Sequence, residues 1–259
     1  TGIPQATQDA MRGFPSIGLH NLHYNAGPVA EMAMTLLLAA AKHLVPIDQA
    51  LRRHDWRPRY EPSPSIMLEG KLALIYGYGA IGKRVARGCI GLGMEAVGIR
   101  RKVTVAYEDG AVRVTDASEL PDLLPRTTAL MVCLPQTSET TGVIGREELA
   151  VLPEESVVVN VGRGELIEEQ ALYEALAEGR VHSAGMDVWY EYPKDRESRG
   201  NTPAGNYPFH ELDNLVMSPH RGALGGEAET MRMTELAELL NAAARGETIP
   251  NRVDVAIGY

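Results

Sequence analysis

Short apolar runs alternate with amphipathic stretches along the chain from residue 70 onward. Several runs have the length and the Val, Ile and Leu content of buried strands: LALIY, EAVGI, TALMVCL, SVVVNV, HSAGMDV and NLVMS. Amphipathic segments separate some of these runs, such as residues 80–92 and 168–179. Apolar strands with helices between them are typical of a parallel sheet covered on both faces. The pattern therefore predicts an α/β fold with a doubly wound parallel sheet.

The flanking regions have other patterns. Residues 1–26 mix Gly, Pro and His around short apolar stretches, which indicates the end of a small α/β unit. Residues 27–45 predict one long helix with Pro28 in its first turn, where a missing N–H costs little. The Pro-rich stretch RPRYEPSPS at 57–65 predicts a linker. Residues 225–245 predict a final amphipathic helix.

Composition and charge exclude several classes of protein. The 259 residues carry a net charge of −9, which disfavours a nucleic-acid binder because phosphate contacts need cations. The longest apolar run, VAEMAMTLLLAAAKHLV, contains Glu31, Lys42 and His43, so we interpret it as a buried helix and expect no membrane span. Cys89 and Cys133 lie in apolar segments without metal-ligand spacing, and no metal is expected. Free thiols and the lack of a visible secretory signal favour the cytoplasm.

A glycine-rich loop follows the first apolar run. The sequence ALIYGYGAIGKRVA contains G-x-G-x-x-G at Gly77, Gly79 and Gly82, between a predicted strand and a predicted helix. This context is the one in which the motif binds a dinucleotide. The first glycine permits a tight turn, the second admits a pyrophosphate, and the third lets helix and strand pack closely. The first helical amides, including those of Ala80 and Ile81, would then face the phosphates.

The residues after the second strand indicate which dinucleotide is bound. An acidic side chain there would bond the ribose 2′-hydroxyl of NAD. The chain instead reads GIRRKVT, which places Arg100, Arg101 and Lys102 at that point. These cations could pair with a 2′-phosphate, so we predict NADP. In the alternative interpretation they are solvated surface charges and NAD binds.

Four further segments carry a resemblance to a known family. They are NAGPVAEMAMTLLLA, CLPQTSETTGVI, VVNVGRGELIEEQAL and VMSPHRG. Together with the glycine loop, their order and spacing resemble the D-isomer-specific 2-hydroxyacid dehydrogenases. That family includes phosphoglycerate, glycerate, D-lactate and formate dehydrogenases and the glyoxylate/hydroxypyruvate reductases. The resemblance covers the chain from residue 1 to residue 259.

The resemblance implies a Rossmann-type cofactor domain and part of a second, flavodoxin-like substrate domain. Most of the substrate domain would precede residue 1. The expected division of the chain is 1–26 as the end of the substrate domain, 27–222 as the dinucleotide-binding domain with its linking helix, and 223–259 as the return to the substrate domain. Family members usually dimerise through the cofactor domain and its linking helix, so a homodimer is expected.

The resemblance also assigns chemistry to single residues. Arg163 in NVGRGE matches the family's arginine, which holds the substrate carboxylate and polarises the carbonyl. His220 in SPHRG matches the acid/base histidine, whose imidazole exchanges a proton near neutral pH. Thr1, Gly2 and Asn25 match positions near the substrate. Residues expected near the cofactor by the same resemblance are Leu134, Pro135, Thr140, Val161, Gly162, Asp187 and Gly222.

One departure from the family concerns the partner of the histidine. In most members a Glu that raises the histidine pKa stands directly before the proline that matches Pro193. Here that position is Tyr192, and Glu191 lies one residue earlier. A bulge could turn Glu191 inward, Tyr192 could be a neutral hydrogen-bond partner of His220, or the site could be catalytically weak. We favour the neutral tyrosine, because formate dehydrogenases place a neutral glutamine at this position.

The function expected from these residues is hydride transfer between NADP and a small 2-hydroxy or 2-oxo acid. An alternative from another class is a cofactor-sensing binding protein, because some relatives of this fold act as corepressors. The presence of both Arg163 and His220 favours the enzyme.

Overall fold

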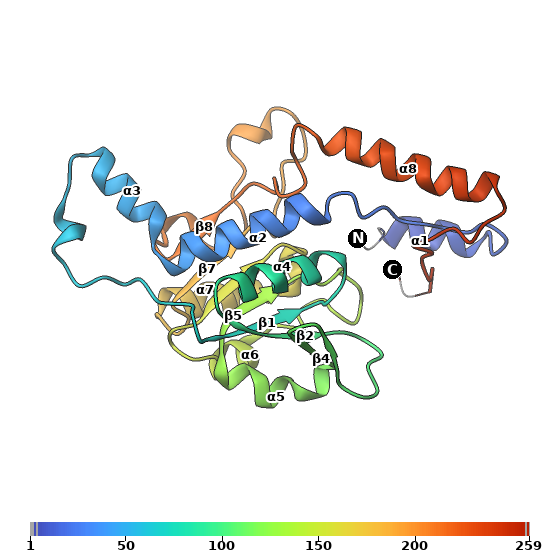
Figure 1. The fold of residues 1–259 in the computed structure, drawn as a ribbon. Coiled ribbons are helices and arrows are strands. Elements are labelled where there is room, and N and C mark those ends of the chain that lie inside the picture. Colours follow the sequence, from blue (N-terminus) through green and yellow to red (C-terminus); the bar gives the residue numbers. More distant parts are fainter. Residues whose placement is uncertain (1–2, 4, 257, 259) are drawn as a thin grey trace.

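The computed structural model describes residues 3, 5–256 and 258, so the predicted substrate residues Thr1 and Gly2 lie outside the described part. Eight strands form one sheet in the order β3-β4-β2-β1-β5-β6-β7-β8 (Figure 1). Every neighbouring pair is parallel except β3 and β4, which are antiparallel. The strands are β1 (Leu72–Tyr76), β2 (Glu95–Ile99), β3 (Tyr107–Asp109), β4 (Val112–Thr115), β5 (Thr127–Val132), β6 (Val157–Asn160), β7 (Ser183–Met186) and β8 (Leu215–Met217). The predicted α/β class and doubly wound sheet are confirmed.

Helices cover both faces of the sheet. The α-helices are α1 (Gln5–Arg12), α2 (Ala26–Ala41), α3 (Leu44–Arg52), α4 (Ala80–Gly91), α5 (Leu120–Leu123), α6 (Arg146–Val151), α7 (Glu169–Ala177) and α8 (Ala228–Ala244). Short 3-10 turns are η1 (Arg57–Arg59), η2 (Ala117–Glu119), η3 (Leu124–Arg126), η4 (Gly164–Leu166), η5 (Ser198–Gly200) and η6 (Phe209–Glu211). Helices α2 and α4 pack against one face, and α5, α6 and α7 pack against the other. The chain therefore winds in both directions from the centre of the sheet.

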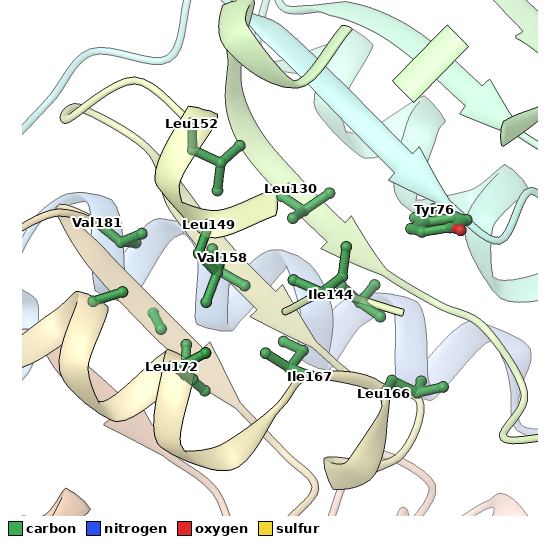
Figure 2. Packing of buried hydrophobic residues seen from close by; sticks show 14 of the residues in the cluster. Tyr76, Leu130, Ile144, Leu149, Leu152, Val158, Leu166, Ile167, Leu172 and Val181 are labelled. Atoms are coloured by element: carbon green, nitrogen blue, oxygen red, sulfur yellow. The ribbon is translucent and has the colours of Figure 1, made fainter. Parts of the chain in front are cut away.

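Each face has its own hydrophobic core. Figure 2 shows part of the core beneath α6 and α7, where Leu130 and Val158 of the sheet meet Leu149 and Leu172 of the helices. All four side chains are buried. Strands buried on both faces need apolar residues at every position, which explains why the predicted strands are continuous apolar runs.

The sheet has a switch point between β1 and β5. From β1 the chain moves outward through β2 and β4, then returns across β1 to continue through β5, β6, β7 and β8. Ligands of open α/β sheets bind at the carboxyl ends of the strands beside such a reversal. The glycine loop follows β1, and residues 133–141 follow β5, so both lie at this place.

Helix α1 and residues 251–256 lie away from the sheet (Figure 1). The N–H of Val253 donates to the carbonyl of Leu19 (2.8 Å), and the N–H of Asn21 donates to the carbonyl of Asn251 (3.1 Å). These bonds join the described C-terminal segment to residues 19–21. The domain boundaries themselves stay predictions.

The predicted single helix over residues 27–45 is wrong at its end. Helix α2 stops at Ala41, and α3 begins at Leu44 with a bend of 68° between the two helices. His43 between them has a φ of 48°, a left-handed conformation that interrupts a helix. Pro46 in the first turn of α3 also lacks the N–H that a continuous helix would use.

Helix α3 and the chain after it protrude from the body (Figure 1). We call residues 44–67 the arm. Within the described residues, no single helix is long and apolar enough to cross a membrane, and only the bent pair of α2 and α3 satisfies length and composition together.

Candidate active site

The glycine loop is shaped by close contacts that only glycine allows. Gly77 has a φ of +107°, and a Cβ there would lie 2.7 Å from the carbonyl carbon of Cys133. A Cβ at Gly82 would lie 2.9 Å from Cγ2 of Ile75 and would touch the carbonyl oxygen of Gly77. Gly79 differs, because no atom lies within 4 Å of its Cβ position. The first and third glycines thus bring chain segments together, while the second opens onto free space.

A large cavity adjoins this free space. Its volume is about 1300 Å³, which exceeds the roughly 300–1,000 Å³ of most small-molecule sites and suits a dinucleotide beside a substrate. Its wall includes predicted cofactor and substrate residues: Asn25, Gly77, Gly79, Ala80, Ile81, Arg100, Arg101, Leu134, Pro135, Val161, Gly162 and Arg163. Among the described residues, no Asp or Glu lines it. In a chain with net charge −9, this cavity is suited to anions.

One end of the cavity carries the three cations after β2. Arg100, Arg101 and Lys102 all line it, and the N–H of Arg100 donates to the carbonyl of Thr115 (2.9 Å). That bond fixes the start of the loop against β4. The guanidinium of Arg101 lies 3.9 Å from the exposed carboxylate of Glu139, at the limit of an ion pair. The cations therefore stand where a ribose 2′-substituent is expected.

Arg163 lies on the turn after β6, on the same cavity wall. The turn is held by Asn160, whose fully buried side chain bonds the backbone twice. Its Nδ2 donates to the carbonyl of Arg163 (2.8 Å), and its Oδ1 accepts from the N–H of Gly162 (3.0 Å). Gly164 follows directly, and a Cβ there would lie 2.5 Å from the carbonyl carbon of Trp189. Asn160 and Gly164 thus fix the backbone that carries the guanidinium.

His220 lies on a strained loop after β8 that one buried carboxylate holds. His220 has a φ of 55°, which is uncommon for a residue with a side chain. Oδ1 of Asp187 accepts from Ser218 Oγ (2.5 Å) and from the N–H of Arg221 (2.8 Å), and Oδ2 accepts from the N–H of Gly222 (2.8 Å). Asp187 is only 2% exposed. These bonds compensate the carboxylate for burial and hold the backbone on both sides of His220.

Tyr192 contacts His220 directly. Its Oη lies 2.9 Å from Nδ1 of His220 and also accepts the N–H of Trp189 (3.1 Å). Glu191 is exposed, and within the described part of the chain its carboxylate forms no hydrogen bond or ion pair; its N–H donates to the carbonyl of Ala204 (3.1 Å). The neighbouring positions therefore face different surroundings, and the phenol is beside the imidazole.

The surroundings of His220 favour its neutral form. Burial is the main cause that lowers the pKa of His220, and the positive charge of Arg163 lowers it further, while Asp187 acts in the opposite direction. Burial raises the pKa of Tyr192, so the phenol is un-ionised at neutral pH. Because the partner is neutral, nothing at Nδ1 offsets the desolvation of the imidazolium as a carboxylate would.

The other predicted residues that the structure describes, His220 and Tyr192 among them, do not line this cavity and have structural contacts instead. Thr140 does not line the cavity; its Oγ1 donates to the carbonyl of Pro135 (2.7 Å) and accepts the N–H of Thr137 (2.8 Å), which closes the loop after β5. Gly222 is buried, and a Cβ there would lie 2.7 Å from Oδ2 of Asp187. Roles of Thr140, Asp187 and Gly222 toward a cofactor stay predictions.

Sequence reasoning missed several residues of the site. Thr137, Ser138 and Thr141 line the cavity from the loop after β5, and Asn251 and Arg252 line it from the C-terminal return. The Thr and Ser residues could have been predicted from the sequence, because they lie in the segment CLPQTSETTGVI that carries the resemblance.

The fold and the glycine loop define a dinucleotide-binding domain of the doubly wound class. The chain belongs to the D-isomer specific 2-hydroxyacid dehydrogenase family, whose NAD-binding domain model matches residues 34–222.

Individual relatives agree with this assignment. D-3-phosphoglycerate dehydrogenase of Methanocaldococcus jannaschii is 36% identical over 230 residues, covering 88% of this chain and 41% of that protein. Glyoxylate reductase of Aeropyrum pernix is 34% identical, covering 87% of this chain and 65% of that protein. The chain thus spans less than two thirds of these relatives. The crystal structure of a D-isomer specific 2-hydroxyacid dehydrogenase from Xanthobacter autotrophicus Py2, in complex with NADPH and MES, shares the fold at a TM-score of 0.80 with 23% identity and full coverage of both chains.

Proposed function

We propose that the protein transfers a hydride between NADP and a small 2-hydroxy or 2-oxo acid. Arg163 holds the substrate carboxylate, His220 exchanges the proton, and Tyr192 holds the imidazole. The observation that carries the proposal is the cavity wall, which brings the glycine loop and Arg163 together without any carboxylate among its described residues. Both named relatives act on 2-hydroxy or 2-oxo acids by their names.

The residues present fit a dinucleotide. Free space at Gly79 admits a pyrophosphate, and the twelve-residue helix α4 begins there with amides that have no partner in the helix. Arg100 and Arg101 lie where a 2′-phosphate would be recognised, which favours NADP over NAD. Bound there, the nicotinamide would supply the hydride chemistry, and the protein would supply orientation and charge.

The protein's own groups divide the remaining tasks. The guanidinium of Arg163 is planar and permanently charged, so it can bind a carboxylate through two parallel bonds and polarise the adjacent carbonyl. In the direction of reduction, imidazolium Nε2 of His220 donates a proton to the developing alkoxide. Tyr192 occupies Nδ1, so Nε2 is the atom left to face a substrate. Because Asp187 fixes the loop, the ring keeps this orientation through the reaction.

Two measurements on the full protein test the proposal. The first is a pair of fluorescence titrations, and we expect a Kd for NADPH at least about tenfold below that for NADH. The second is turnover of NADPH with glyoxylate, hydroxypyruvate and phosphohydroxypyruvate, and we expect at least one of them to be reduced. Tighter binding of NADH would overturn the choice of NADP. Binding of either cofactor without turnover of any 2-oxo acid would favour the cofactor-sensing alternative.

We also propose that the protein is a homodimer and that the arm forms part of the interface. The arm exposes large apolar side chains at Leu44, Leu51, Trp56 and Tyr60, of which Trp56 is 61% and Tyr60 81% exposed. Leu44 and Leu51 are seven residues apart on α3 and so share one face of it, and exposed apolar side chains gathered on one face mark interaction surfaces. A second copy of the chain is the occupant that the family resemblance favours.

Light scattering of the full protein tests the dimer. Trp56→Glu should produce monomers, because a charge would be buried in the interface. Leu240→Glu on α8 is the matched control, since Leu240 is also 61% exposed but lies off the arm. A monomeric unmodified protein, or equal effects of both variants, would overturn the proposed interface.

A further inference from the structure

Two histidines meet at the end of α2 opposite to the glycine loop. His43 lies in the break between α2 and α3, and His182 lies directly before β7, 139 residues later. Their Nε2 atoms are 3.1 Å apart, and the rings meet edge to face with centroids 4.9 Å apart. One Nε2–H must donate to the lone pair of the other Nε2. The contact therefore requires that at least one of these two nitrogens carries no proton.

This contact lies at the root of the arm. Ala50 is the one buried residue of helix α3, so the arm has little packing of its own. His43 has a left-handed φ of 48° and begins α3 without a side-chain cap. Lys42 at the end of α2 donates to the carbonyl of Ile66 (2.6 Å), and the N–H of Ile66 donates to the carbonyl of Ala41 (3.0 Å), so the far end of the arm is tied to α2. The imidazole pair, in contrast, joins the bend between the helices to the sheet.

We propose that His43 and His182 form a proton-sensitive latch that holds α3 at its angle to α2. With no proton added, one imidazole donates and the other accepts. A first proton can enter at the Nδ1 of the donor ring and leaves the Nε2–H···Nε2 bond intact. A second proton must occupy the accepting Nε2, so the bond has no acceptor left and two cations face each other. The latch opens at this second step.

The surroundings set the direction of the response. Burial lowers the pKa of both His43 and His182, and the charge of His43 lowers the pKa of His182 further. The charged neighbours are Asp213, which raises the pKa of His43, and Glu155, which raises that of His182 and lies 3.7 Å from Lys71. Burial outweighs both carboxylates. Since both folded-state pKa values lie below 6.5, the ordinary value for histidine, the latch is fully present above pH 6.5 and is lost as the pH falls through the lower of the two steps.

The latch controls where the arm points. The exposed side chains of Leu44, Leu51 and Trp56 leave the body in the direction that the bend gives them. Opening the latch frees the bend, so acid would change the placement of this apolar surface while the sheet and the glycine loop remain folded. The inference does not depend on the proposed oxidoreductase activity.

Hydrogen exchange of the full protein between pH 7.5 and pH 5 tests the latch, with EDTA present to remove metal ions. We expect the protection factors of α3 amides to fall about tenfold, while those of α4 change by less than about twofold. His43→Asn should remove this pH dependence, because asparagine tolerates a left-handed φ but does not titrate. His54→Asn is the matched control, since His54 has a φ of 63° on the same arm. It should respond to pH as the unmodified protein does.

NMR titration of the two histidine rings in the unmodified protein tests the latch even if a variant does not fold. The ring signals of His43 and His182 in the unmodified protein should titrate in two coupled steps below pH 6.5. Independent titration of both rings at or above pH 6.5 would overturn the latch. So would protection of α3 that is constant across the pH range, or pH-dependent loss of protection that persists in His43→Asn.

Discussion

The cofactor side of the site is made of backbone, whereas the His220 side is made of side-chain hydrogen bonds. At Gly77 and Gly82 the missing Cβ atoms let three chain segments touch. At His220, the phenol of Tyr192 holds the ring and the carboxylate of Asp187 holds the loop. The two sides also differ in charge, because the cavity wall carries cations while the partner of the imidazole is neutral.

This difference predicts how each side responds to change. Backbone contacts of less than 3 Å cannot relax around an added methyl group, so a substitution there acts nearly as all or none. A hydrogen bond to an imidazole instead shifts a pKa by a limited amount, so the chemistry changes gradually. Arg163 belongs to both sides, since it lines the cavity and its charge lowers the pKa of His220.

The largest effect is expected at Arg163. Arg163→Gln should lower kcat/KM for a 2-oxo acid about 1000-fold, because it removes the charge that holds the carboxylate and polarises the carbonyl. The pH at which the rate of reduction falls should also become higher, since the guanidinium no longer lowers the pKa of His220. Steady-state kinetics across pH measure both. Arg126→Gln, at an exposed ion pair with Glu95, is the control, and a loss below tenfold at Arg163 would contradict its role.

The second-largest effect is expected on the cofactor side, where a substitution can weaken cofactor binding without lowering the stability of the fold. Gly79→Ala should weaken NADPH and NADH about 100-fold alike, because its Cβ enters the space expected to hold the pyrophosphate. The melting temperature should stay within about 2 °C, since no protein atom lies within 4 Å of that Cβ. Gly91→Ala on the same helix has equal space and should change neither quantity. Unchanged binding by Gly79→Ala would place the phosphates elsewhere.

The cofactor side of the site was also the side that could be predicted best from the sequence. Its signals are local: LALIY became β1 at its full length, and the glycines follow within six residues. The hairpin of β3 and β4 was missed, because β3 is mostly exposed and polar and has no apolar run. Asp109 and Gly110 at its turn were the available signal.

The side-chain contacts were harder to predict because their partners are distant along the chain. Tyr192 could be named only by counting from motifs, and nothing in the sequence decided between it and Glu191. The three bonds that Asp187 accepts from residues 218–222 depend on strands β7 and β8 lying side by side. The end of α2 depends on the conformation of His43, which meets a partner 139 residues away.

Cofactor choice should show an intermediate effect. Changing Arg100 and Arg101 together to Ala should weaken NADPH about 10- to 30-fold, because the 2′-phosphate loses charge-assisted bonds. The Kd of NADH should change by less than about threefold, so the preference for NADPH over NADH becomes smaller or reverses. Fluorescence titration measures the Kd of NADPH and of NADH. The salt concentration is kept constant, because the attraction between charges depends on the ionic strength. The same double change at Arg57 and Arg59 on the arm is the control; equal losses for NADPH and NADH would make Arg100 and Arg101 general attractors of anions.

The smallest effect is expected at Tyr192, and it tests the His220 side of the site most directly. Reduction needs the imidazolium of His220, so its rate should fall as the pH rises through a pKa below 6.5. Tyr192→Phe should lower kcat about three- to tenfold, because the ring loses its partner at Nδ1. Hydrogen bonds stabilise a charged ring more than a neutral one, so losing Oη should move the pH limb to still lower pH.

Glu191→Gln is the neighbouring control for this change. Its carboxylate is exposed and forms no bond among the described residues, so the pH limb should stay in place and kcat should change by less than about twofold. If Glu191→Gln instead moved the limb downward and Tyr192→Phe left it unchanged, the carboxylate would be the partner of His220 during turnover. The loop would then have to rearrange when substrate binds, and the neutral phenol contact would belong to the free protein alone.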